Sequence, residues 1–318
     1  MLVVEALENL LQIDGDKPAE RRTSLSAELW KAYAIAAQDV ANQNRLLVGD
    51  DGGWSDYAAR LGTASPAGGR ALFAYLAQQS KTRATRQSAQ LHLAYSLQNS
   101  KLPLTATRLF DDDALFPVAE LDPQARFLLG GMASESNQPR AAARYWQGLA
   151  PPPALDVDEW RLRLASVMVR GGMADAGADA LRALLGGKKT LPADVVHRSV
   201  DVLQDFPDGQ SNKTADELYR AMLPLAMSKE RREILLALAR SAETRKDFRS
   251  AADYFTEAAL FSDGKAPDLP AIDARIAAAV NLARAGFKDD ARAQFESLRK
   301  NVRDAEKLEL IRRELLKL

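Results

Sequence analysis

The chain has 318 residues, of which 47% are hydrophobic and 27% are charged, a balance that suits a folded core and argues against a disordered chain. Its 43 basic residues equal its 43 acidic residues, so it lacks the basic excess expected of a nucleic-acid partner. It has no cysteine, which excludes thiol nucleophiles, zinc–cysteine sites, iron–sulfur clusters and disulfides.

The beginning of the chain carries an apolar run that Glu5 and Glu8 interrupt, without a basic leader, so we do not expect a signal peptide there. Nowhere does the sequence contain the roughly eighteen consecutive apolar residues that a membrane-spanning helix needs. We therefore expect no membrane span in this chain.

Helical periodicity follows and continues to the end of the chain. Residues 27–41 place apolar side chains on one helical stripe, namely Leu29, Tyr33, Ala36, Ala37 and Val40. Convincing alternation of the kind that strands show is absent, so we expect an all-α fold. Glycine and proline mark the expected breaks between helices, chiefly Gly15–Pro18, Gly49–Gly53, Gly62–Gly69, Pro151–Pro153, Gly186–Gly187, Pro207–Gly209 and Gly264–Pro270.

A pattern of small and large residues recurs along the second part of the chain. In residues 246–263, Ala251 is followed four residues later by Phe255 and then by Ala258, and Ala142, Trp146 and Leu149 repeat the spacing. Such small residues lead six units, separated by 34 to 40 residues, at Ala106, Ala142, Ala176, Ala215, Ala251 and Ala291. We expect the small residue to let two helices of a hairpin approach, and the aromatic residue to fill the gap to the next hairpin.

A large–small pair precedes the leading alanine in several units, as in Leu129–Gly130 and Leu238–Ala239. With this spacing, residues 83–300 resemble the tetratricopeptide repeat family. The resemblance implies a right-handed α-α superhelix, a solenoid of helical hairpins, that recognises proteins. On this basis we divide the chain into an N-terminal helical segment of degenerate repeats or a cap (1–82), TPR-like repeats (83–302) and a C-terminal capping helix (303–318).

The resemblance also implies a binding surface, because the first helix of each hairpin faces the concave groove in that family. The positions that would contact a protein or peptide partner there are Tyr95, Gln98, Phe127, Ser134, Arg161, Met168, Glu233 and Arg240.

Catalytic and metal-binding patterns do not withstand inspection. His92 and His197 are the only histidines and belong to different helical units. Residues 184–190 have lysines after a glycine pair, but Arg182 stands where a phosphate loop needs glycine, so we expect a helix stop. The acidic clusters at Asp50–Asp51 and Asp111–Asp113 lack calcium-loop spacing, and helix caps or solvated turns explain them better. We expect no enzyme activity, no metal and no cofactor.

The expected function is a protein–protein interaction scaffold within a larger bacterial envelope or secretion assembly, such as one that exports exopolysaccharide. The absence of cysteine suits the periplasm, and a cytoplasmic location is the alternative. Two other functions remain open: the helical superstructure of a cell-wall enzyme such as a lytic transglycosylase, and the sensor module of a cytoplasmic regulator.

Overall fold

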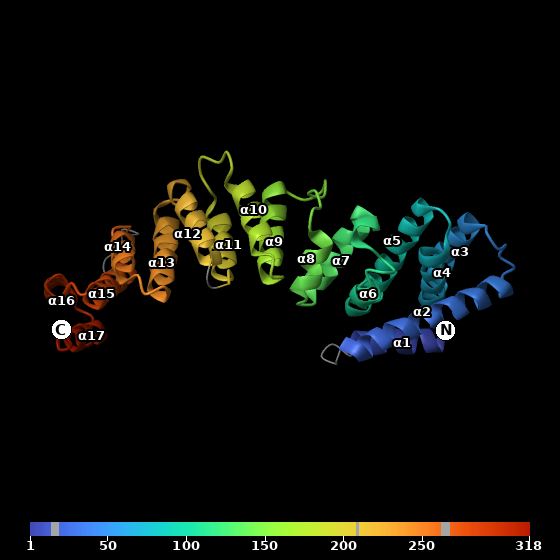
Figure 1. The fold of residues 1–318 in the computed structure, drawn as a ribbon, viewed down its shortest axis with the longest axis horizontal. Coiled ribbons are helices and arrows are strands. Elements are labelled where there is room, and N and C mark those ends of the chain that lie inside the picture. The colour runs from blue at the N-terminus through green and yellow to red at the C-terminus, as the bar shows by residue number, and fades with distance from the viewer. Residues whose placement is uncertain (14–18, 208–209, 262–267) are drawn as a thin grey trace. The chain divides into compact units, whose positions relative to one another are not determined.

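The computed structural model describes residues 1–13, 19–207, 210–261 and 268–318 (Figure 1). The breaks expected at Gly15–Pro18, at Gly209 and over most of Gly264–Pro270 lie wholly or largely outside these ranges. The described residues form seventeen α-helices and two short 3-10 helices and contain no strand, which confirms the all-α class. Two compact units, Met1–Ala150 and Pro151–Leu318, divide the chain. This division falls inside the range 83–302 that the sequence groups together.

The first unit is built around one helix, α4, which packs against α2, α3 and α5. Figure 1 shows α4 between these neighbours. The elements of this unit are α1 (Leu2–Ile13), α2 (Ala19–Gln43), α3 (Asp51–Ala64), α4 (Pro66–Gln79), α5 (Arg83–Asn99), α6 (Pro103–Leu109), η1 (Val118–Glu120), α7 (Pro123–Glu135) and α8 (Pro139–Trp146).

Glycines in this unit serve close packing more than chain reversal. A Cβ on Gly69 would lie 2.9 Å from the Ala58 carbonyl oxygen and 2.9 Å from the Gly62 Cα, so α3 and α4 touch backbone to backbone. The break expected across Gly62–Gly69 is correspondingly wrong in extent, because both glycines are helical and the interruption is confined to Ser65.

The N-terminal helix α1 is fixed by polar bonds to helices far along the chain. The Glu8 carboxylate receives the guanidinium of Arg70 from α4 and the hydroxyl of Tyr33 from α2, while the hydroxyl of Thr105 in α6 donates to the Glu8 carbonyl oxygen at 2.7 Å. The side chains of Glu8, Arg70 and Tyr33 are all buried. Residues 1–82 thus pack with later helices, and α4 also packs against α5 across residue 82.

The hairpin of α7 and α8 shows the expected close approach in its clearest form. A Cβ on Gly130 would lie 2.1 Å from Trp146 Nε1, so only glycine leaves room for this indole. The indole N–H donates to the Phe127 carbonyl oxygen at 3.0 Å. Trp146 therefore packs against α7 within its own hairpin.

The second unit is a further succession of helices. Its elements are α9 (Val157–Arg170), α10 (Ala174–Leu185), α11 (Ala193–Gln204), α12 (Gln210–Met222), η2 (Leu223–Leu225), α13 (Ser228–Thr244), α14 (Phe248–Ala258), α15 (Leu269–Arg284), α16 (Lys288–Asn301) and α17 (Ala305–Leu315). In this unit α9 packs against α10, α13 against α14, and α14 against α15, while α11 and α12 also pack against helices beyond their chain neighbours.

The small–aromatic pattern joins successive helices in part of this unit. Phe255 of α14 packs with Ala239 of α13 and Ala278 of α15, which joins one helix pair to the next as expected. The expected small residue was wrong by one position in the third repeat unit. Ala176 is only partly buried, and its neighbour Gly177 is the residue that contacts α9. A Cβ on Gly177 would lie 2.5 Å from Val169 Cγ2, because α9 and α10 approach there.

All four tryptophans are buried, so none forms an exposed binding platform. Trp54 lies inside α3, which begins at Asp51, within the break expected at Gly49–Gly53. The Asp50 carboxylate caps this helix by accepting a hydrogen bond from the Gly53 N–H at 2.9 Å. The Trp54 ring stacks on Tyr75 of α4 with centroids 4.9 Å apart.

The last helix, α17, packs back onto the preceding helices. Ile311 is fully buried in a cluster with Ile276 of α15 and Phe295 of α16. The leucine-rich end of the chain therefore packs against α15 and α16.

Candidate functional site

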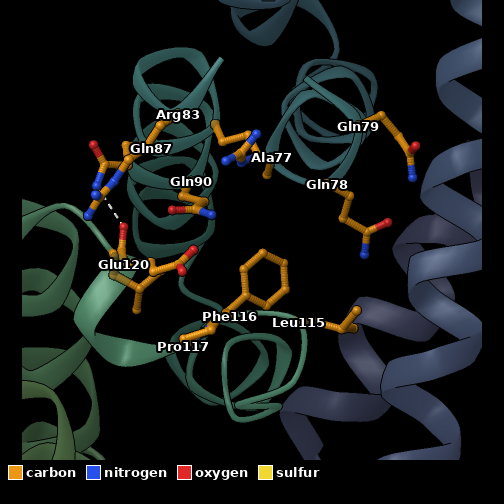
Figure 2. Close-up of a pocket in the computed structure, with 12 residues that line it drawn as sticks. Ala77, Gln78, Gln79, Arg83, Gln87, Gln90, Leu115, Phe116, Pro117 and Glu120 are labelled. Atoms are coloured by element: carbon orange, nitrogen blue, oxygen red, sulfur yellow. Dashed lines mark hydrogen bonds between the residues drawn. The ribbon is translucent and has the colours of Figure 1, made fainter. Parts of the chain in front are cut away.

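A cavity of about 230 Å³ opens in the first unit, between the end of α4, the first half of α5 and residues 115–121 (Figure 2). The chain between the end of α6 at Leu109 and the start of α7 closes one side of the cavity. In the view of Figure 2, residues 115–117 of this segment lie below α4 and α5. Amide and charged side chains outnumber the apolar ones in its lining.

The floor of the cavity is apolar and rigid. Phe116 is 1% exposed, and its ring packs between Trp30, at 5.1 Å, and Phe110, at 5.0 Å between centroids. Because both neighbours are themselves buried, this ring supports the cavity without offering a free face. Beside it, Leu115 is 50% exposed and is the apolar side chain that a bound molecule would cover.

Amide groups line the cavity, contributed by Gln78, Gln79, Gln87 and Gln90. Gln90 extends from α5 into the space above Phe116 (Figure 2). It is only 7% exposed, and its Oε1 is buried without a hydrogen-bond partner. A buried acceptor left unpaired destabilises the folded state by about 1 to 3 kcal/mol, so an amide in this condition points to a missing partner.

The amide beside it is already engaged, because Gln87 Nε2 donates to the Glu120 carbonyl oxygen at 2.6 Å and so joins α5 to η1 (Figure 2). Arg86 Nη1 likewise donates to the carbonyl oxygens of Ser80, at 2.9 Å, and Lys81, at 3.2 Å. These bonds fix two walls of the cavity.

Charged side chains form part of the rim. Arg83, Arg86 and Glu120 line the cavity, and within the described ranges none of the three forms an ion pair. Two guanidinium groups and one carboxylate leave the rim with a positive balance.

A second cavity, of about 270 Å³, lies in the second unit between α11, α12 and α13. Arg240, one of the expected partner-binding residues, lines it. Two of its buried or half-buried polar groups bond to the protein: Tyr219 donates to the Val200 carbonyl oxygen at 3.3 Å, and Ser241 donates to Asp216 Oδ1 at 2.8 Å. Among the described residues that line it, no buried side-chain polar atom lacks a hydrogen-bond partner. Burial raises the pKa of Tyr219, which keeps this phenol a neutral donor. The cavity of the first unit is therefore the stronger candidate.

The expected partner-binding residues are divided between the two units. In the first unit, Tyr95 and Gln98 are exposed on α5, and Ser134 is exposed on the neighbouring α7. Phe127 is half-buried, because its ring stacks on Trp146 with centroids 6.1 Å apart. None of these four lines the cavity of that unit.

In the second unit, Met168 corrects the expectation: it lies on α9 and is 1% exposed, so its side chain is not available to a partner. Arg161 lies within 3.5 Å of Asp158 on its own helix. Glu233 forms an ion pair with His197 when that histidine is protonated. Arg240 is exposed at the second cavity.

The residues with potential chemistry are mostly engaged by the fold. His92 stacks on Phe73, with centroids 5.0 Å apart, and its Nδ1 lies 2.7 Å from the Ser88 carbonyl oxygen. Asp111 and Asp113 both pair with Arg144. Among the described residues no cluster of histidine, aspartate and glutamate is placed to hold a metal ion. Over the same ranges, every helix is too short or too polar to cross a bilayer.

The cavity residues were missed by the sequence analysis, although one signal was present. Gln90 precedes Leu93 by three residues and Leu97 by seven, so an amide occupies a position on the apolar stripe of α5. A polar residue at such a position either finds a partner in the fold or marks a site.

Comparison with protein-family models gives no match, and no curated protein matches the chain significantly. The function therefore has to be argued from the residues themselves.

Proposed function

We propose that this chain is a non-enzymatic scaffold that binds segments of partner proteins, built as a TPR-like solenoid of helical hairpins. The observation that carries the proposal is the cavity of α4, α5 and residues 115–121, where the unpaired carboxamide of Gln90 and the exposed Leu115 line the same space. The helix pairs joined by small and aromatic residues support the solenoid part of the proposal.

A polypeptide segment is the ligand that this lining fits. Peptide groups need both donors and acceptors, and carboxamides supply both. Apolar side chains of a partner gain from contact with Leu115, and the rigid floor of Phe116 limits the entropy lost on binding.

Short random peptides displayed on phage, selected against the full chain, test this function. We expect recovered peptides to bind the purified chain saturably in fluorescence anisotropy. If the folded chain selects no peptide and instead binds soluble β-1,4-linked N-acetylglucosamine oligomers, the scaffold proposal fails and a cell-wall superstructure takes its place.

The proposal includes a place in a bacterial envelope or secretion assembly, which the absence of cysteine supports. Fractionation of the source cells followed by immunoblotting tests this part separately. Recovery of the chain in the cytosolic fraction alone would remove the envelope location and leave the peptide-binding function standing.

A further inference from the structure

We propose that the cavity of the first unit holds an extended peptide segment, and that the carboxamide of Gln90 pairs with the main-chain N–H and C=O of one residue of that segment. This inference rests on the proposed function and names the ligand of its site. A neighbouring apolar side chain of the same segment covers Leu115.

The unpaired state of Gln90 is the first step of the argument. Its Oε1 is buried without a partner, and no hydrogen bond of its Nε2 is formed within the described ranges. Both the acceptor oxygen and the donor nitrogen of this amide are therefore available to a ligand. The terminal torsion of glutamine is broad, so this group can turn within the cavity to meet a ligand.

The geometry of an extended chain supplies the matching pair. In an extended chain the N–H and C=O of one residue point to the same side, as they do in a hydrogen-bonded pair of antiparallel strands. A carboxamide carries one acceptor beside its donors. One glutamine can thus satisfy both groups of one residue, and this recognition is independent of that residue's side chain.

The remaining lining favours a peptide over two other ligands. A sugar usually stacks on an open aromatic face, but the Phe116 ring is 1% exposed and held between Trp30 and Phe110. A cationic side chain is opposed by Arg83 and Arg86 on the rim, which outnumber the single carboxylate of Glu120. An uncharged main-chain segment meets neither obstacle.

The inference makes stability and binding respond in opposite directions. Gln90→Met replaces the unpaired amide with an apolar side chain of similar length, so the melting temperature should stay level or rise. Affinity for a selected peptide should fall at least tenfold, because the partner's N–H and C=O would be buried unpaired. Gln38→Met, at an exposed position of α2 that does not line the cavity, is the matched control and should leave affinity unchanged.

A second measurement varies the peptide and begins with the wild-type chain. Methylating the main-chain nitrogens of a selected peptide one at a time should reveal one position where affinity falls at least tenfold. That position should lose its sensitivity in Gln90→Met, which shows that the two groups are coupled. Leu115→Ser, at a half-exposed position, should weaken the same peptide without unfolding the chain.

The outcomes separate this inference from the proposed function. Peptides that bind equally well to wild type and Gln90→Met, with no sensitive main-chain nitrogen, would overturn the inference and leave the scaffold function standing. Selection of no peptide by the folded chain would overturn both.

Discussion

Arg70 and Glu8 form a two-pronged ion pair in the interior of the first unit. Arg70 Nε lies 2.7 Å from Glu8 Oε1, and Nη2 lies 2.5 Å from Oε2. The two side chains are 3% and 1% exposed. The Tyr33 hydroxyl donates to the same carboxylate at 2.6 Å, and Arg70 Nη1 donates to the Ser100 hydroxyl at 2.7 Å. The pair joins α1 to α4 across 62 residues of chain.

Replacing only one partner of this pair should unfold the protein readily. Arg70→Met leaves the Glu8 carboxylate buried without its counter-charge, which costs about 3 to 5 kcal/mol in the free energy of unfolding. Urea unfolding at neutral pH, followed by circular dichroism, measures the loss. A change within about 1 kcal/mol of wild type would mean that solvent reaches the carboxylate in the folded chain.

The matched control removes the whole buried network. Glu8→Leu combined with Arg70→Met and Tyr33→Phe leaves no buried charge and no buried phenol at this point. We expect this triple variant to regain much of the lost free energy of unfolding, because well-packed apolar residues replace buried ion pairs at little cost.

Local sequence predicted the hairpins well and their exact register less well. Ala251 with Phe255 and Ala291 with Phe295 are buried where the spacing placed them, because a small residue and an aromatic residue one turn apart suit one helical contact. In the unit that α10 begins, alanine and glycine stand side by side at 176 and 177. Spacing alone cannot decide which of the two touches α9, since that depends on the position of Val169.

The candidate site could not be predicted from the sequence, for a different reason. The cavity joins the end of α4 and the start of α5 to residues 115–121, and the irregular path of that segment is set by tertiary contacts of Phe116. The family resemblance directed attention to outward positions of first helices instead. It failed at Met168, because the packing of α9 covers a position that the repeat pattern assigns to the groove.

Two adjacent glycines in α7 should respond to the same substitution with opposite signs. A Cβ on Gly130 would lie 2.1 Å from Trp146 Nε1, so Gly130→Ala should lower the free energy of unfolding by about 1 to 3 kcal/mol through overpacking. A Cβ on Gly131 meets nothing within 4 Å, so Gly131→Ala should stabilise by up to about 1 kcal/mol through helix propensity. Thermal unfolding of the two variants makes the comparison, and equal effects would refute the close approach of α7 and α8.

An acid-sensitive contact lies in the second unit at Glu159. Hydrogen bonds from Arg198 and then from Arg163 lower the pKa of this carboxyl to about 2. Its folded pKa lies below its unfolded value of about 4.3, so its contribution is present above that pH and is lost as pH falls toward 2.

Glu159→Gln should therefore destabilise most at neutral pH, by about 1 to 2 kcal/mol because solvent partly screens the pair. The difference from wild type should vanish near the lowest pH at which the chain still folds. Urea unfolding across this pH range measures it. Arg198→Met removes the larger cause and should shift the loss of stability to higher pH. A constant difference between Glu159→Gln and wild type at every pH would exclude this origin.

The ion pairs of Arg144 should behave unlike the buried pair of Arg70. Arg144 Nη1 lies 2.8 Å from Asp111 Oδ1, and its other terminal nitrogen pairs with Asp113, but these carboxylates are 69% and 72% exposed. Arg144→Met should cost less than about 1 kcal/mol in the free energy of unfolding, because water already solvates both acids. Salt at about 1 M screens charges beyond roughly 3 Å, so it should shrink this loss and leave that of Arg70→Met almost unchanged. Paired urea titrations at low and high salt make the test, and a loss of several kcal/mol that salt does not alter would mean that the turn at 111–113 excludes water around Arg144.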